Sequence, residues 1–188
     1  MKSLIAYTSK NGTTADCVSR LSEQLQGLDV TVADLSVTTP NVSDFDLAIA
    51  GGSVRYARLD PALRRLLRDQ REALLQVPLA LFLVCGLAHE YEYYEEVLLP
   101  RELREHAFSV MYLGGSLRKD GLPLWDRLIV SSLRSRIMES EIEDGEYTPS
   151  LPGILPESIE RLATYARQRL NAAPARQNGE NNGTKETP

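Results

Sequence analysis

The fold class of this chain is decided by one stretch near its start, Leu4-Ile5-Ala6-Tyr7-Thr8-Ser9-Lys10-Asn11-Gly12-Thr13-Thr14. The first four residues form an apolar run typical of a short buried strand, and a polar segment with an Asn-Gly turn signal follows. From Ala15 to Leu25, apolar residues recur at helical spacing. The stretch therefore predicts a strand, a polar loop and a helix in direct succession.

The rest of the chain repeats this alternation. Further strands are expected at Asp29 to Leu35, Leu47 to Ala50, Leu79 to Cys85 and Phe108 to Leu113. Further helices are expected from the Asp60-Pro61 cap through Leu74, over Glu92 to Glu105 with an interruption near Pro100, and from Pro156 to Leu170. Five strands alternating with helices imply an α/β fold, a doubly wound five-stranded parallel sheet with helices on both faces.

Length and composition indicate one globular domain. The 188 residues are 43% hydrophobic and 25% charged, close to the average for such domains. We expect residues 1–170 to form the domain, with 119–155 as an insertion after the last strand. Residues 171–188, rich in Asn, Gly, Ala and Pro, are expected to be a disordered tail.

Charge and run length exclude several functions. A net charge of −5 argues against a nucleic-acid binder. The longest apolar run, Val77 to Val84, is far shorter than the roughly 18–20 residues of a membrane span, and the N-terminus turns polar too early for a signal peptide. We therefore expect a cytoplasmic protein with at most peripheral membrane contact. Cys17 and Cys85 form no CxxC and are expected to be buried hydrophobes, and no metal site is expected.

The loop after the first strand is suited to an anion. In a doubly wound sheet the ligand lies beyond the carboxyl ends of the strands, and this loop combines four hydroxyls with a direct entry into a helix. It lacks GxxxxGK(S/T) and GxGxxG, so a single terminal phosphate fits better than a nucleoside triphosphate or a dinucleotide. The alternative is an ordinary polar turn with a threonine at the helix N-cap.

The same stretch resembles the signature of the flavodoxins, an apolar strand ending in an aromatic residue followed by x-(S/T)-x-x-(A/G/C)-x-T. Tyr7, Ser9, Gly12 and Thr14 fill these positions. The resemblance implies a flavodoxin-like fold that binds FMN, with the loop holding the phosphate. The residues implied in phosphate binding are Thr8, Ser9, Asn11, Gly12, Thr13 and Thr14.

The resemblance also implies that the flavin ring is held by the loops after the third and fourth strands. The residues expected to bind it are Ser53, Val54, Arg55, Tyr56, Gly86, Leu87, Ala88, Tyr91 and Tyr94. Four of the eight tyrosines fall in these loops, and aromatic faces stack well on a flavin ring. For Tyr91, Tyr93 and Tyr94, the alternative is local packing at the start of the next helix.

Several segments resemble a subgroup, the menaquinone-dependent protoporphyrinogen dehydrogenase family of haem synthesis. The segments are Met1 to Ile5, Gly52 to Tyr56, Gly115 to Arg118 and Trp125 to Arg127. This resemblance implies an FMN-dependent oxidoreductase that dehydrogenates a small-molecule substrate, protoporphyrinogen, and passes electrons to a quinone. Two alternatives stay open: a non-enzymatic electron carrier of flavodoxin type with a redox protein partner, and a flavin-free interaction module.

Arg55 and Arg118 are the candidate catalytic residues, because a cation near the flavin ring would stabilise the reduced anion and raise its potential. The alternative for Arg55 is a surface ion pair. The basic character continues along the next helix as either a solvated face or a docking patch, through Arg58, Arg64, Arg65, Arg68 and Arg71. His89 is either a proton relay or a plain exposed histidine.

The insertion contains an amphipathic helical pattern from Trp125 to Ile137. Such a helix would cover the flavin, admit a hydrophobic quinone or rest on a membrane; the alternative is packing on the sheet edge. Residues 119–150 carry four basic and seven acidic side chains, which counts against adhesion to an anionic membrane.

Overall fold

The structure is a computed structural model that describes residues 1–86, 91–115 and 153–172. The expectations for Leu87, Ala88, His89, Arg118 and the pattern from Trp125 to Ile137 therefore lie outside the described residues. None of the helices within the described ranges is long and apolar enough to cross a membrane.

The fold is built on one sheet with five parallel strands and one extra strand. The parallel strands are β1 (Lys2–Thr8), β2 (Asp29–Asp34), β3 (Leu47–Arg55), β5 (Leu79–Val84) and β6 (Ser109–Tyr112), in the order β2-β1-β3-β5-β6. The short β4 (Arg58–Leu59) pairs antiparallel with the end of β3. The order changes direction between β1 and β3, so these two strands flank the crevice in which ligands of such sheets bind.

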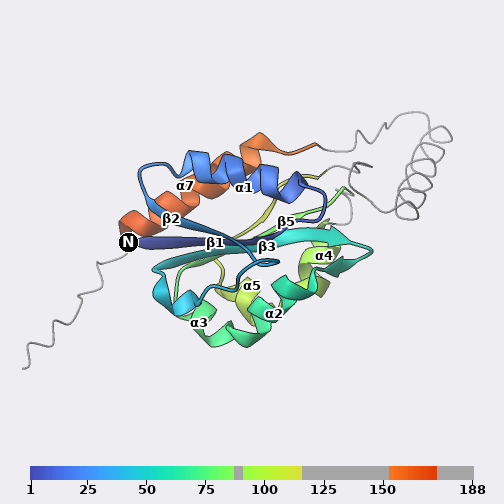
Figure 1. Cartoon of the computed structure of the whole chain (residues 1–188), viewed down its shortest axis with the longest axis horizontal. Coiled ribbons are helices and arrows are strands. Elements are labelled where there is room, and N and C mark those ends of the chain that lie inside the picture. The colour runs from blue at the N-terminus through green and yellow to red at the C-terminus, as the bar shows by residue number, and fades with distance from the viewer. Residues whose placement is uncertain (87–90, 116–152, 173–188) are drawn as a thin grey trace, which may run out of the picture.

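Helices cover both faces of the sheet (Figure 1). One face carries α1 (Thr13–Gln24) and α7 (Pro156–Ala172), and the other carries α2 (Pro61–Asp69), α3 (Arg71–Leu75), α4 (Tyr91–Leu98) and α5 (Arg101–His106). A short 3-10 turn, η1 (Val42–Asp44), precedes β3. Because both faces are covered, two separate hydrophobic clusters form, and every residue of β5 is buried. The doubly wound α/β fold predicted from the sequence is confirmed.

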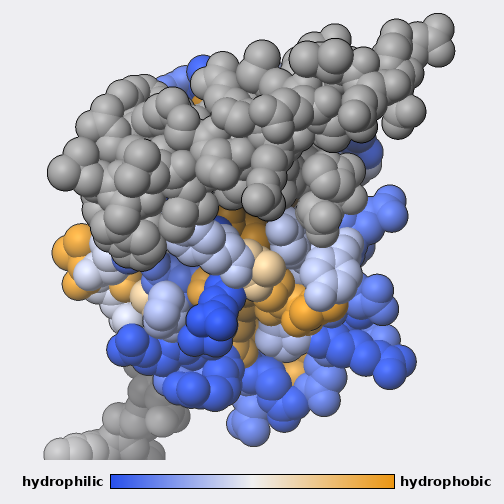
Figure 2. Space-filling view, turned by 90° about the vertical axis from the view of Figure 1, so that its right-hand side faces the viewer, coloured by the Kyte–Doolittle hydropathy of each residue, from blue (hydrophilic) through white to orange (hydrophobic). Residues whose placement is uncertain are grey.

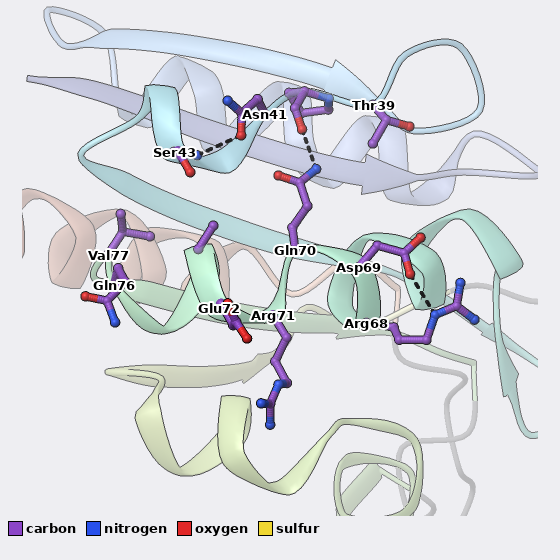
Figure 3. A pocket seen from close by; sticks show the side chains of 12 residues that line it. Thr39, Asn41, Ser43, Arg68, Asp69, Gln70, Arg71, Glu72, Gln76 and Val77 are labelled. Carbon is purple, nitrogen blue, oxygen red and sulfur yellow. Dashed lines mark hydrogen bonds and ion pairs between the residues drawn. The ribbon is translucent and has the colours of Figure 1, made fainter.

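The Asp60-Pro61 signal starts α2 as predicted. The Asp60 Oδ1 accepts a hydrogen bond from the Ala62 N–H at 2.9 Å, and Pro61 occupies the first helical position. The predicted single helix through Leu74 is divided, because α2 ends at Asp69 and α3 begins at Arg71. The residue between them, Gln70, holds the loop before β3 through two hydrogen bonds of 2.7 Å. Its Nε2 donates to the Pro40 carbonyl (Figure 3), and its Oε1 accepts from the Val42 N–H.

The predicted end of the third strand was wrong. β3 continues through Arg55, so residues 51–55 are strand and not loop. The two glycines allow this, because a Cβ on Gly51 would lie 2.2 Å from the Phe82 carbonyl oxygen and a Cβ on Gly52 would lie 2.4 Å from Thr8 Oγ1. Glycine therefore permits the close approach of β3 to its neighbours instead of ending the strand.

Two helix ends also differ from the prediction. α1 begins at Thr13, two residues before the expected Ala15, so two residues of the polar loop form its first turn. α7 extends to Ala172, so Asn171 and Ala172, expected in the tail, complete its last turn. The predicted interruption near Pro100 is confirmed, because α4 ends at Leu98 and α5 begins at Arg101.

The two segments that flank residues 116–152 lie side by side. The Gly115 N–H donates to the Gly153 carbonyl at 3.2 Å, and the Leu155 N–H donates to the Leu113 carbonyl at 3.0 Å. Gly114 and Ile154 form an antiparallel bridge. The last residues of the expected insertion thus pair with the extension of β6 before entering α7.

Candidate cofactor site

The strand register brings the predicted binding segments to one edge of the sheet. Thr8 pairs with Gly52, and Ser53 pairs with Val84, so the carboxyl ends of β1, β3 and β5 are adjacent. This edge lies on the right in Figure 1 and faces the viewer in Figure 2, where hydrophobic residues show at its centre among hydrophilic ones. The first loop, the end of β3 and the start of the segment after β5 therefore share one site.

The first loop enters α1 through a glycine in a left-handed conformation. Gly12 is the N-cap with φ 85°, a value that glycine adopts without strain, and it provides no side chain to cap the helix. Ser9 supplies part of the capping instead, because its Oγ accepts a hydrogen bond from the Ala15 N–H at 3.3 Å. Asn11 is half-buried beside Gly12. The loop thus presents the positive end of the α1 dipole at the sheet edge.

Two buried hydroxyls in this loop have no partner among the described residues. Thr8 Oγ1 at the end of β1 and Thr14 Oγ1 in the first turn of α1 are inaccessible to solvent and make no hydrogen bond to any described group. Leaving a buried polar group unsatisfied costs roughly 1–3 kcal/mol. Ser3 Oγ shares this property but lies at the opposite end of β1.

These observations test whether a phosphate fits the loop. A phosphate oxygen accepts hydrogen bonds from hydroxyls and from the N–H groups at a helix N-terminus, which are the groups gathered here. Thr13, also buried, adds a third hydroxyl in the same turn. The donor set therefore fits a phosphate, and it needs no lysine to do so.

The second segment forms a tight hairpin between β3 and β4. Its two turn residues, Tyr56 and Ala57, have positive φ values of 51° and 53°, although neither is glycine. Backbone strain of this kind is found disproportionately at functional sites. The turn leaves Tyr56 52% exposed, and the Arg55 guanidinium carbon lies 5.7 Å from the centre of its ring. Ser53, Val54 and Arg55 are half-buried along the strand that leads to it.

The third segment packs more tightly than the sequence suggested. Gly86 follows the buried Cys85 and is half-buried. Tyr91 stacks on Tyr112 of β6, with ring centres 5.0 Å apart, and the Tyr112 hydroxyl donates to the Cys85 carbonyl at 2.8 Å. Tyr94 is only 8% exposed and belongs to the core on the α2 side of the sheet. This packing corresponds to the alternative of local contacts for these tyrosines.

Burial keeps the two stacked tyrosines protonated. It raises the pKa of Tyr112 and, together with the nearby Glu95 carboxylate, the pKa of Tyr91 above the usual range. The sequence interpretation missed Tyr112. Its position at the carboxyl end of the last predicted strand was the available signal, because that end lies at the ligand edge of the sheet.

A cationic cavity of about 300 Å³ lies between the hairpin and the start of α2. Its lining residues are Lys10, Ser53, Arg55, Tyr56, Arg58, Leu59, Asp60, Pro61 and Arg64. Lys10 Nζ lies 3.0 Å from Asp60 Oδ2. This ion pair joins the first loop to the N-cap of α2, and no local sequence pattern indicated it, since its partners are far apart in the chain.

A larger cavity, about 760 Å³, lies elsewhere (Figure 3). It is bounded by the loop before η1 and by the junction of α2 and α3. Several of its polar side chains have protein partners, as with the two hydrogen bonds of Gln70 and the ion pair between Arg68 and Asp69. No predicted binding residue lines this cavity, and its lining segments precede β3 and β5, away from the carboxyl ends of the strands where ligands of such sheets bind.

Comparisons with known proteins found similarity both in sequence and in structure. A family model described as "Flavodoxin domain" matches residues 4–142. Protoporphyrinogen IX dehydrogenase (quinone) of Escherichia coli strain K12 is 23% identical over 179 residues, which cover 89% of this chain and 94% of that protein.

Two solved structures illustrate the structural similarity. Oxidised Flavodoxin 1 from Bacillus cereus has a TM-score of 0.45 and 13% identity, with 93% of this chain and 100% of that chain covered. The apo form of an NADH:FMN oxidoreductase has a TM-score of 0.47 and 15% identity, with 82% of this chain and 95% of that chain covered.

Proposed function

Because the chain belongs to the flavodoxin domain family, we propose that it is an FMN-dependent oxidoreductase that dehydrogenates an organic substrate and passes the electrons to a quinone. Its cofactor is FMN. The observation that carries the FMN assignment is the pair of buried threonine hydroxyls without a partner among the described residues, Thr8 at the end of β1 and Thr14 in the first turn of α1. In flavodoxin, which has the corresponding strand order, FMN lies at the switch point between β1 and β3, where this loop is found.

The phosphate of FMN is bound by the first loop. The residues assigned to it are Thr8, Ser9, Asn11, Gly12, Thr13 and Thr14. The ring is held at the same edge by Ser53, Val54, Arg55, Tyr56, Gly86, Leu87, Ala88 and Tyr91, with Tyr94 supporting α4 from the core. The exposed ring of Tyr56 is the side chain best placed to stack on the flavin.

When bound, FMN supplies an acceptor for a hydride from the substrate. Arg55 then stabilises the negative charge that reduction places on the ring, and Arg118 is assigned the same role. Each turnover removes a hydride and a proton from the substrate and delivers two electrons and two protons to the quinone.

A charge pattern favours the enzyme over a simple electron carrier. Residues 51–58 contain two arginines and no acidic residue, whereas residues 85–96, which contain the other ring-binding segment, carry four glutamates. Positive charge near the ring stabilises the reduced anion and raises the potential, as a hydride acceptor requires, whereas surrounding carboxylates would lower it. Because the E. coli relative is named for protoporphyrinogen IX and a quinone, we assign these two substrates to this chain as well.

The first experiment is the visible spectrum of the purified protein, with mass identification of any released flavin. FMN is the expected result, and a colourless protein that also fails to bind added FMN would contradict the proposal. The second experiment adds protoporphyrinogen and a menaquinone analogue under anaerobic conditions. If the flavin exchanges electrons with redox proteins but not with these compounds, the protein is a carrier and not a dehydrogenase.

A further inference from the structure

We propose that the cationic cavity between the β3–β4 hairpin and α2 binds the carboxylates of an acidic organic substrate through Arg58 and Arg64. This inference rests on the proposed function, because it assigns a substrate class to the same edge of the sheet. The two residues that carry it, Arg58 and Arg64, are not among those assigned to FMN.

The cavity shares only part of its lining with the residues assigned to FMN. It is lined by one side of the hairpin and by the N-terminal turn of α2. Of the first loop only Lys10 reaches it, and neither the hydroxyl residues of that loop nor Gly86, Tyr91 or Tyr94 line it. Ser53, Arg55 and Tyr56 line it and are also assigned to the flavin ring. A substrate group bound by Arg58 and Arg64 would therefore lie next to the ring-binding segment.

The single acidic residue of the cavity is already engaged. Asp60 Oδ1 accepts from the Ala62 N–H at 2.9 Å, and Asp60 Oδ2 pairs with Lys10 at 3.0 Å. The Asp60 side chain is only 9% exposed. Because the charge of Asp60 is paired with that of Lys10, the net positive charge of the cavity comes from its arginines.

Two of these arginines lie directly opposite each other. Arg55 and Arg58 are cross-strand partners in the antiparallel pairing of β3 with β4. Side chains at such positions project from the same face of the sheet, and like charges there destabilise the pair. An anion bound beside Arg58 would reduce this repulsion. The strained turn at Tyr56 and Ala57 holds the two strands in this register.

The arginines of α2 and α3 differ in their partners. Arg68 pairs with Asp69 at 2.7 Å, and Arg71 pairs with Glu102. Arg58 and Arg64, in contrast, are exposed, line the cavity, and form no ion pair with a described acidic residue. In a protein with a net charge of −5, this is a local excess of positive charge.

The residues that line the cavity favour an organic ligand that carries carboxylates. A guanidinium binds a carboxylate through two parallel hydrogen bonds, a geometry that a lysine cannot reproduce. The apolar surfaces of Tyr56, Leu59 and Pro61 stand beside these cations. Two arginines beside apolar side chains can bind a hydrophobic molecule that carries two carboxylates.

The test measures binding to the FMN-loaded protein, not turnover. The probe is mesoporphyrin IX, an oxidised dicarboxylic porphyrin, and its dimethyl ester serves as the uncharged counterpart. We expect Arg58→Gln/Arg64→Gln to raise the Kd of the diacid by about 10-fold or more, since charge-assisted hydrogen bonds are lost, and to leave the Kd of the ester unchanged. The matched control, Arg68→Gln/Arg71→Gln, should leave both values unchanged, because these arginines do not line this cavity.

Several results would overturn the inference. These are equal affinities of the unmodified protein for diacid and ester, equal losses for both ligands in the variant, or an equal loss in the control. It also falls if the two arginines affect the binding of NADPH, a phosphate ligand, and not that of the diacid. FMN content is measured in every sample, so a failure of the cofactor assignment is seen separately. If the diacid binds as expected but protoporphyrinogen is not oxidised, the substrate proposed above is wrong and the carboxylate site stands.

Discussion

Replacing Thr14 with valine should change the stability of the apoprotein and its affinity for FMN in opposite directions. Thr14 Oγ1 is fully buried and has no hydrogen-bond partner among the described residues. Valine has nearly the same shape, so the variant removes the polar atom and leaves the packing intact. The position lies in the first turn of α1, where the two residues have similar helix propensity.

The size of both changes depends on whether the Thr14 hydroxyl has a hydrogen-bond partner. Without cofactor, removal of an unsatisfied buried group relieves a penalty of roughly 1–3 kcal/mol, so the free energy of unfolding of the apoprotein should rise. A gain of about 1 kcal/mol corresponds to roughly 2–4 °C in Tm for a domain of this size. With FMN, the variant loses a charge-assisted hydrogen bond worth roughly 1.5–3 kcal/mol, which weakens binding by about 10- to 150-fold.

The assays are urea unfolding of the apoprotein and fluorescence titration with FMN and riboflavin. Riboflavin, which lacks the phosphate, should bind Thr14→Val as it binds the unmodified protein. The matched control is Ser3→Ala, which removes a buried, unpartnered hydroxyl at the opposite end of β1. It should affect neither flavin. Equal weakening of FMN and riboflavin by Thr14→Val, or unchanged affinity for FMN, would refute the assignment of the loop to the phosphate.

Three further predictions follow from other parts of the structure. Arg55→Gln should lower the two-electron midpoint potential of the bound flavin by about 30 mV, equivalent to about 1.4 kcal/mol, in a spectroelectrochemical titration; an unchanged potential would place Arg55 away from the ring. Gly52→Ala should destabilise the protein by about 1–3 kcal/mol in urea, because its Cβ would lie 2.4 Å from Thr8 Oγ1, whereas Gly153→Ala, whose Cβ meets nothing within 4 Å, should be nearly neutral. Burial raises the pKa of Cys17 from 9.0 to about 11, so the thiol ionises first in the unfolded chain, and stability should fall between these pH values by about 1.4 kcal/mol per pH unit from this group. Cys17→Ala should show a shallower decline over that interval, and an identical slope would contradict the assignment.

Local sequence signals predicted the elements that are specified by residues close together in the chain. The continuous apolar run of β5 and the Asp60-Pro61 start of α2 are examples, since covered strands and helix caps are specified within a few residues. The first loop was also recognised, because its hydroxyls, glycine and following helix are contiguous in the chain.

Features that depend on distant residues were missed. Gly51 and Gly52 were interpreted as the end of a strand, but the space they leave is defined by Phe82 and Thr8 on neighbouring strands. The pairing of Lys10 with Asp60 likewise joins segments that only the fold brings together. The same holds for the stacking of Tyr91 on Tyr112. Periodicity and motifs contain no information on such contacts.

The hydrogen bond between Gly115 and Gly153 has a consequence for how the protein can change over evolution. The two ends of residues 116–152 are already adjacent in the folded domain, so a replacement of any length closes the same gap. Loop-closure entropy depends only logarithmically on loop length. A turn of a few residues in place of this segment would therefore change the free energy of loop closure by about 2 kcal/mol. Insertion, deletion or exchange of this segment by recombination therefore leaves the register of the sheet untouched. The junction is a point at which a flavodoxin-type domain can acquire or lose a long segment while its fold stays the same.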